Sequence, residues 1–82
     1  MSAELDWGEA ADYILGQRPG LEPEHVWAVL KELGDPPSRA QERLALELIA
    51  HAAHGVSARD ARAILTEWRA YADIAAERDW DD

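Results

Sequence analysis

The chain has 82 residues, no cysteine and a formal net charge of -9. This length suits one domain, and the absence of cysteine excludes disulfides and thiolate metal sites and favours a reducing compartment. The N-terminal residues are acidic, unlike a signal peptide. The most apolar run, residues 44–53, is much shorter than the ~20 residues that cross a membrane. We therefore expect one cytoplasmic domain over residues 1–82, with no membrane segment.

Helical spacing of apolar residues begins close to the N-terminus. The pattern predicts a first helix that starts near Trp7 and ends near Gly16. Pro23 suits the first position of a second helix, and Gly34 supplies its C-terminal cap before two prolines break the chain. Each helix carries one apolar stripe, so both should pack against a common core.

A third helix is predicted over residues 38–54, where Ser38 and Gln41 have capping-box spacing. Apolar residues cover well over half of its circumference, including Leu44, Leu48 and Ile49. A helix this apolar should be surrounded by other helices. We therefore expect residues 38–54 to form the centre of the bundle.

A short turn separates the third helix from a fourth. Gly55 favours a C-terminal cap and Ser57 the next N-cap, so the fourth helix should run from Ala58 to about Arg78. The acidic tail, residues 79–82, should fray. The predicted fold is a compact all-α, four-helix domain in which the third and fourth helices form a tight hairpin.

Charge is distributed unevenly along the chain. Residues 37–70 hold five basic and four acidic residues, whereas residues 71–82 hold one basic and five acidic residues. On the fourth helix, the outward positions are predicted to be Arg59, Arg62, Thr66 and Arg69, all on one side. The least acidic segment therefore presents a row of arginines.

Residues 49–65, IAHAAHGVSARDARAIL, resemble a helix-turn-helix motif. The resemblance lies in Gly55 at the turn, apolar Val56, Ser57 as the cap, and Ala61 and Ile64 facing the preceding helix. It implies that the helix starting at Ser57 approaches DNA. The residues that would contact DNA are Ser57, Ala58, Arg59, Arg62 and Thr66, with Arg69 continuing the row. Because a net charge of -9 opposes approach to phosphates, DNA binding is the alternative hypothesis.

Glu47, His51 and His54 share one side of the third helix at i, i+4 and i+7. This spacing lacks the HExxH pattern of zinc enzymes, so we expect a polar helix edge and no metal. The chain also shows no nucleophile paired with a base and no glycine-rich phosphate loop. We therefore expect no enzyme activity, no cofactor and no small-molecule substrate.

Several large apolar residues fall outside the core stripes. They are Trp27, Ile74, Tyr13 and Trp80, together with Leu5. Exposed apolar residues that cluster together are typical of interfaces. The first hypothesis is therefore a non-catalytic interaction or regulatory module, an acidic adaptor or inhibitor of a bacterial or phage cytoplasmic system. It would bind a protein partner or form a homo-oligomer.

Overall fold

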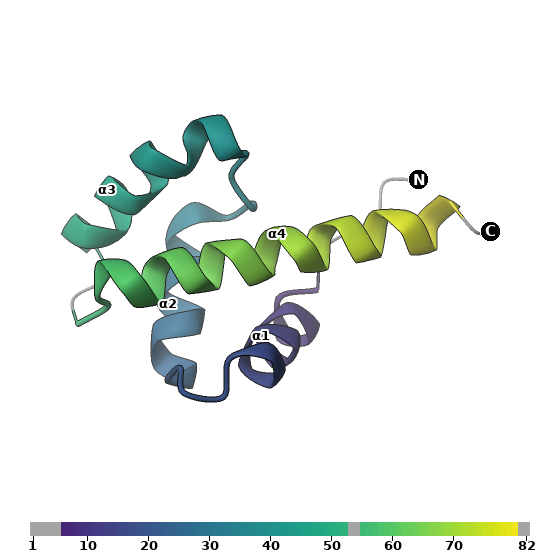
Figure 1. Cartoon of the computed structure of the whole chain (residues 1–82), viewed down its shortest axis with the longest axis horizontal. Helices are drawn as coiled ribbons and strands as arrows, with labels where there is room; N and C mark the ends of the chain where they lie inside the picture. Colours follow the sequence, from purple (N-terminus) through teal and green to yellow (C-terminus); the bar gives the residue numbers. More distant parts are fainter. Residues whose placement is uncertain (1–5, 53–54, 81–82) are drawn as a thin grey trace.

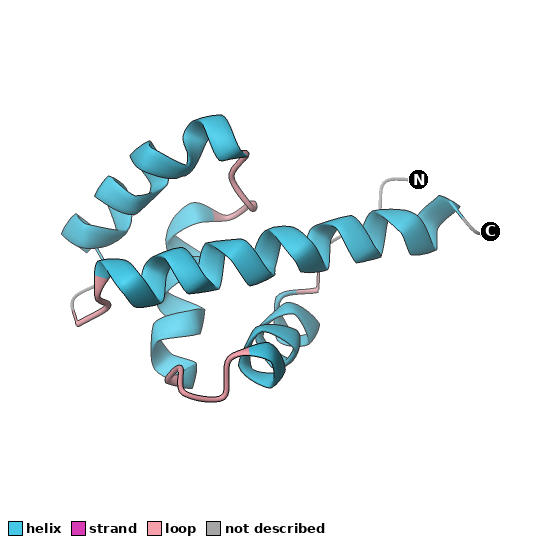
Figure 2. Ribbon diagram, in the orientation of Figure 1, coloured by secondary structure: helices cyan, strands magenta, loops and turns pink. Residues whose placement is uncertain are grey.

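The computed structural model describes residues 6–52 and 55–80, with side chains described up to Glu77. This part of the chain contains a 3₁₀ turn, η1 (Arg39–Gln41), and four α-helices: α1 (Trp7–Gln17), α2 (Pro23–Leu33), α3 (Glu42–Ala52) and α4 (Ala58–Trp80). No strand occurs among the described residues (Figure 2). The all-α, four-helix prediction is confirmed.

The helix ends lie where local backbone chemistry places them. Gly34 and Gly55 have φ values of +75° and +90°, a region that glycine enters without steric cost. The Ser57 hydroxyl accepts a hydrogen bond from the backbone N–H of Asp60 at 3.1 Å, and Ser38 forms the predicted capping box. The turn before α4 therefore reverses the chain sharply, and α3 and α4 form the expected hairpin.

Two predicted boundaries differ from the structure or extend beyond its described part. The predicted third helix is divided into η1 and α3, and its last two residues, 53 and 54, lie outside the described residues. Helix α4 includes residues 79 and 80, the first half of the tail that was expected to fray. Residues 81 and 82 lie outside the described part of the chain.

Helix α4 runs along the long axis of the molecule (Figure 1). It contacts α1, α2 and α3, whereas α1 and α3 do not contact each other in the described part of the chain. Figure 1 shows α1 and α3 on opposite sides of α4, with α2 passing behind it. The shortest dimension is only 16 Å, which suits two layers of helices because packed helix axes lie about 8–10 Å apart.

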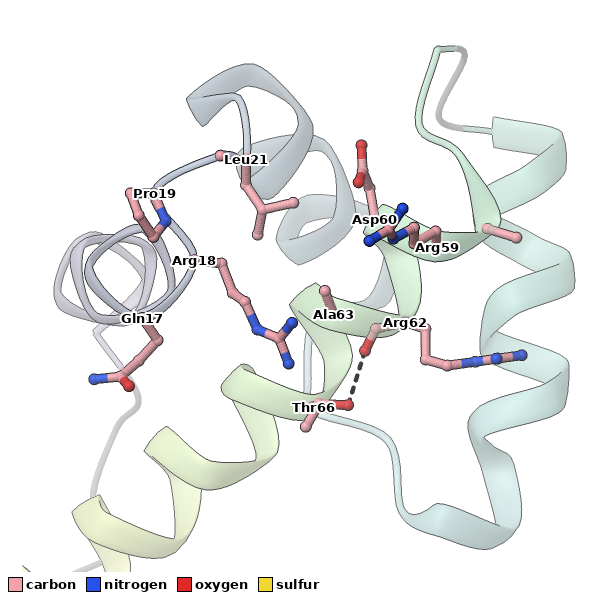
Figure 3. A pocket seen from close by; sticks show the side chains of 11 residues that line it. Gln17, Arg18, Pro19, Leu21, Arg59, Asp60, Arg62, Ala63 and Thr66 are labelled. Carbon is pink, nitrogen blue, oxygen red and sulfur yellow. Dashed lines mark hydrogen bonds between the residues drawn. The ribbon is translucent and has the colours of Figure 1, made fainter.

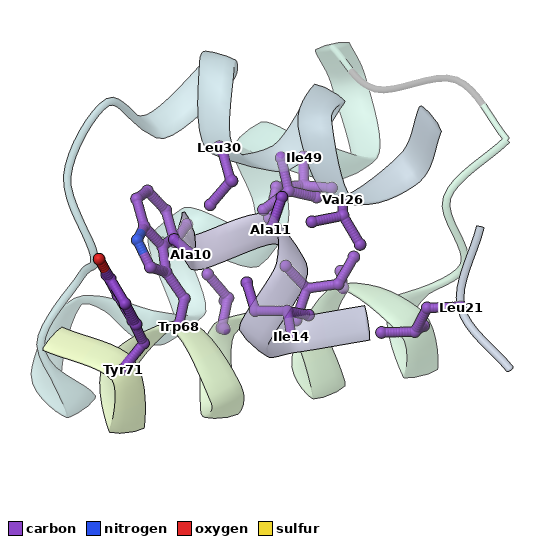
Figure 4. Packing of buried hydrophobic residues seen from close by; sticks show 14 residues of the cluster. Ala10, Ala11, Ile14, Leu21, Val26, Leu30, Ile49, Trp68 and Tyr71 are labelled. Carbon is purple, nitrogen blue, oxygen red and sulfur yellow. The ribbon is translucent and has the colours of Figure 1, made fainter. Parts of the chain in front are cut away.

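The core is centred on the inward face of α4. Trp68 is fully buried and lies among apolar residues from the other helices, including Ile14 and Leu30 (Figure 4). The buried cluster draws on all four helices and on Leu21 of the α1–α2 loop. One continuous core therefore joins three short helices to one long helix.

The expectation that the third helix is central is wrong. Only Ala45 and Ile49 of α3 are buried, while Leu44 and Leu48 are 65% and 53% exposed. The physical reason is that α3 has helical neighbours on one face only, namely α2 and α4. Helix α4 takes the central position, and the surplus apolar surface of α3 faces solvent.

Tyr71 joins the beginning of α1 to the middle of α4. Its ring lies 5.9 Å from that of Tyr13 at a tilt of 45°, and its side chain is buried. Burial raises the pKa of the Tyr71 phenol, and the negative charges of Glu9 and Asp6 raise this pKa further. The neutral phenol is therefore the form that the fold accommodates.

The raised pKa of Tyr71 predicts a loss of stability in alkali. The folded state holds the phenol proton to a higher pH than the unfolded chain does, so this contribution is fully present below about pH 10 and is lost as the pH rises through the folded-state pKa. Urea unfolding at a series of pH values should show a falling free energy of unfolding above about pH 10. The Tyr71→Phe variant should show a smaller fall.

Candidate functional site

An apolar groove lies between the C-terminal end of α2 and the outer flank of α3. Its volume is about 300 Å³, which equals that of roughly ten water molecules. We define this apolar groove by its lining residues: Leu33, Asp35, Pro36, Pro37, Gln41, Leu44, Ala45 and Leu48. A hollow of this size can receive one or two large apolar side chains.

The two exposed leucines form the outer wall of the apolar groove. Leu44 and Leu48 are four residues apart, so they lie on neighbouring turns of the same side of α3. Together with Trp27, they are the large hydrophobic residues that stand exposed in the described part of the chain. Because a solvated leucine contributes little to folding, these positions call for a functional explanation more than a structural one.

Proline shapes the opposite wall of this groove. Pro36 is half-buried and Pro37 is buried, so the segment that ends α2 is packed against the body. Proline fixes φ and offers no N–H, which keeps this wall stiff and apolar. Asp35 beside it is exposed and gives the rim a negative charge.

A second, basic groove lies between the α1–α2 loop and the beginning of α4 (Figure 3). Its volume is about 740 Å³, and we define it by its lining residues: Gln17, Arg18, Pro19, Gly20, Leu21, Ala58, Arg59, Asp60, Arg62, Ala63 and Thr66. Three arginines and one carboxylate give this groove a positive balance. It therefore differs in charge from the rest of an acidic protein.

Two ion pairs hold α4 to its neighbours on either flank. On one side, Arg18 of the α1–α2 loop binds Glu67 with 3.0 Å between Nε and the carboxylate oxygen. On the other side, Arg69 approaches Glu42 of α3 at 3.4 Å. The arginine row predicted from the sequence is therefore divided, because Arg69 is partly buried and engaged with α3.

The remaining residues proposed for DNA contact lie around the start of α4. Arg59, Arg62 and Thr66 are all exposed and line the basic groove. In Figure 3, the Arg62 side chain extends away from the α1–α2 loop, on the side of α3. The Thr66 hydroxyl donates to the carbonyl of Arg62 at 2.9 Å, and the Ser57 hydroxyl caps α4. Arg59 and Arg62 are thus the polar members of the set whose side chains form no hydrogen bond or ion pair within the described part of the chain.

The residues predicted to bind a protein partner do not share one environment. Trp27 is 36% exposed on α2 and lines neither groove. Tyr13 is half-buried against the core and Tyr71, and Ile74 is half-buried on α4. The side chain of Trp80 lies outside the described part, as does Leu5. Their role in binding stays a prediction.

The sequence-based search for a site missed Leu44 and Leu48, because both fitted the apolar pattern of a buried helix. The sequence feature that could have indicated them is the width of the apolar face of the third helix. This face is wider than the neighbouring helices can cover. Pro36 and Pro37 were interpreted only as helix breakers, although they also form a wall.

The polar edge of α3 carries Glu47 and His51, which are both exposed. His54 lies outside the described residues. Within the described residues, no group of three His, Cys, Asp or Glu side chains is placed to hold a metal ion. Equally, none of the helices described is both long and apolar enough to cross a membrane.

Comparison of the chain with models of protein families, with curated proteins and with solved structures finds no match. Any assignment of function must therefore rest on the two grooves and the exposed side chains around them.

The contrast between neighbouring residues of α3 gives a direct test of the apolar groove. Ile49→Ala should lower the free energy of unfolding by about 2–5 kcal/mol, since the buried part of the isoleucine side chain is removed and a cavity is left. Leu48→Ala should change it by less than about 0.5 kcal/mol, as is usual for surface positions. Chemical denaturation of both variants measures the difference. Equal decreases in the free energy of unfolding of the two variants would contradict the outward orientation of Leu48.

Proposed function

We propose that this chain is a non-catalytic protein-interaction module that binds a segment of another protein in its apolar groove. The observation that carries the proposal is the exposure of Leu44 and Leu48 beside a hollow walled by prolines. Contiguous apolar surface of this kind, with a polar rim, is typical of protein interfaces. The module would act as a small acidic adaptor or inhibitor in the cytoplasm.

The chemistry of the groove specifies the bound segment. Its apolar walls favour a partner segment with two apolar side chains on one face, such as an amphipathic helix. The exposed carboxylate of Asp35 lines the groove together with the leucines, and the whole chain has a net charge of -9. Lysine or arginine residues flanking the apolar anchors would complement this charge and speed association.

Replacing both leucines tests this function without disturbing the helix. In a Leu44→Gln, Leu48→Gln variant, the helix propensity stays close to that of leucine, while the apolar wall is lost. If the leucines are central contacts, the variant should bind at least about thirtyfold more weakly, which corresponds to about 2 kcal/mol. The measurement is titration calorimetry with peptides selected from a random library against the unmodified protein.

The matched control changes two exposed residues of the same helix that do not line the apolar groove. Arg43 and Glu47 are exposed and opposite in charge, so replacing both with serine leaves the net charge unchanged. This control should bind selected peptides within about twofold of the unmodified protein. The proposal fails if the peptides lack paired apolar anchors, or if the leucine and control variants bind alike. A protein purified with this chain from its host supports the proposal only if the leucine variant loses it.

DNA binding through the beginning of α4 is the second candidate. The observation that favours it is the exposure of Arg59 and Arg62 in one groove with Arg18. This candidate is weaker, because Arg18 is engaged with Glu67 and Arg69 with Glu42. In addition, an overall charge of -9 repels phosphates at long range. The arginines that remain are few for a nucleic-acid interface.

The second candidate predicts a particular salt dependence. If about three arginines contact phosphates, the logarithm of the DNA association constant should fall with log salt concentration at a slope near -3. An Arg59→Ala, Arg62→Ala variant should show a shallower slope, close to -1. Fluorescence anisotropy with labelled duplexes measures both slopes, and an absence of binding at low salt would eliminate this candidate.

A further inference from the structure

The outward face of α4 carries opposite charges at its two ends. Arg59 and Arg62 lie at the beginning of the helix, and Asp73 and Glu77 lie near its end. All four side chains are exposed, and none forms an ion pair with another described side chain. The face therefore holds two charged groups of opposite sign, separated along one rigid rod.

This charge order is the reverse of the one that stabilises a helix. The N-terminal end of a helix dipole is positive and the C-terminal end is negative, so arginine is unfavourable in the first turn and a carboxylate is unfavourable near the last. Arg59 stands in the first turn, which also holds Asp60 with the favourable sign, and Glu77 stands near the negative end. The stability of α4 alone does not explain this arrangement.

The spacing along the face is symmetric. Positions 59, 63, 66, 70, 73 and 77 follow one another at intervals of four and three residues, which keeps them on one side of a helix. Consider two antiparallel α4 helices related by a two-fold axis at the level of Trp68. Position 59 of one helix would then lie opposite 77 of the other, 63 opposite 73, and 66 opposite 70. The central positions carry the small residues Ala63, Thr66 and Ala70, so two helices could approach closely there.

Nothing in the described chain covers this face. Helices α1, α2 and α3 contact the other sides of α4, and the pairs Arg18–Glu67 and Arg69–Glu42 mark the two edges of the contact. At the other end, the last turns of α4 extend beyond the body of the molecule (Figure 1). The acidic end is therefore a projecting arm, and the basic end borders the basic groove.

We propose that the occupant of this face is a second copy of the chain, with the two α4 helices antiparallel across a two-fold axis. In this dimer, Arg59 of each copy faces Glu77 of the other, and Arg62 lies beside Asp73. The acidic arm of one copy then lies along the basic groove of its partner. The proposal goes beyond the proposed function because it uses a face separate from the apolar groove.

The net charge of each chain does not prevent this pairing. Two chains of charge -9 repel at long range, but at physiological salt the screening length is about 8 Å. Ion pairs in contact across the helices are screened much less than the charges spread over the two bodies. Electrostatic complementarity at the face would also fix the antiparallel orientation.

Charge reversal followed by mixing tests the dimer. The Arg59→Glu, Arg62→Glu variant places acids against acids, and the Asp73→Arg, Glu77→Arg variant places bases against bases. Each variant alone should dimerise at least about tenfold more weakly than the unmodified chain, because like charges opposed across an interface cost more than a tenfold factor in affinity. An equimolar mixture should form a one-to-one heterodimer, since every pair is then complementary. Sedimentation equilibrium from micromolar to millimolar protein measures all four samples.

The reversed charges agree with the helix dipole, so both variants should stay folded, which circular dichroism verifies. An Arg43→Glu, Glu47→Arg variant exchanges two opposite charges on α3 without altering the net charge, and it should dimerise as the unmodified chain does. The Leu44→Gln, Leu48→Gln variant should also remain dimeric, which separates this test from that of the proposed function.

The dimer is overturned if the unmodified chain is monomeric at every concentration, if charge reversal leaves dimerisation unchanged, or if the mixture yields no heterodimer. A monomer that binds duplex DNA through Arg59 and Arg62 would likewise overturn it.

Discussion

The inward face of α4 is the constraint on which the whole structure depends. Helices α1, α2 and α3 have only eleven residues each, a length at which an isolated helix is marginal in water. Helices α1 and α3 pack onto α4 without contacting each other in the described part of the chain, and α2 packs against all three of the other helices. The burial of Trp68 and its neighbours therefore holds together elements that could not persist separately. Such an arrangement should unfold as one cooperative unit.

The helix ends could be predicted from the sequence because their causes are local. Gly34, Gly55 and Ser57 act within a few residues of their own position, so the chain alone contains the necessary information. The position of each helix in the bundle has no such local cause. Leu44 and Leu48 fit the same apolar pattern as Ile49, and only the arrangement of α2 and α4 determines which of the three is covered.

The candidate sites show the same division between local and distant causes. Helical periodicity correctly places Arg59, Arg62 and Thr66 on an exposed side of α4. It could not indicate that Glu42, from a separate helix, approaches Arg69, or that Arg18 reaches Glu67 from the α1–α2 loop. Contacts between residues distant in sequence depend on the packing of whole helices. The apolar groove was missed for the same reason, because its walls come from two separate segments.

The exposed leucines of α3 make the acidity of the chain important for its behaviour in solution. Apolar surface that is exposed in the free protein can associate with the same surface on another molecule, and such contacts lead to aggregation. A net charge of -9 on 82 residues provides colloidal repulsion that opposes non-specific association. As the pH falls toward the isoelectric point, carboxylates are neutralised and this protection weakens. Charge repulsion and the open groove are thus linked, because the surplus of acid opposes aggregation through the exposed leucines.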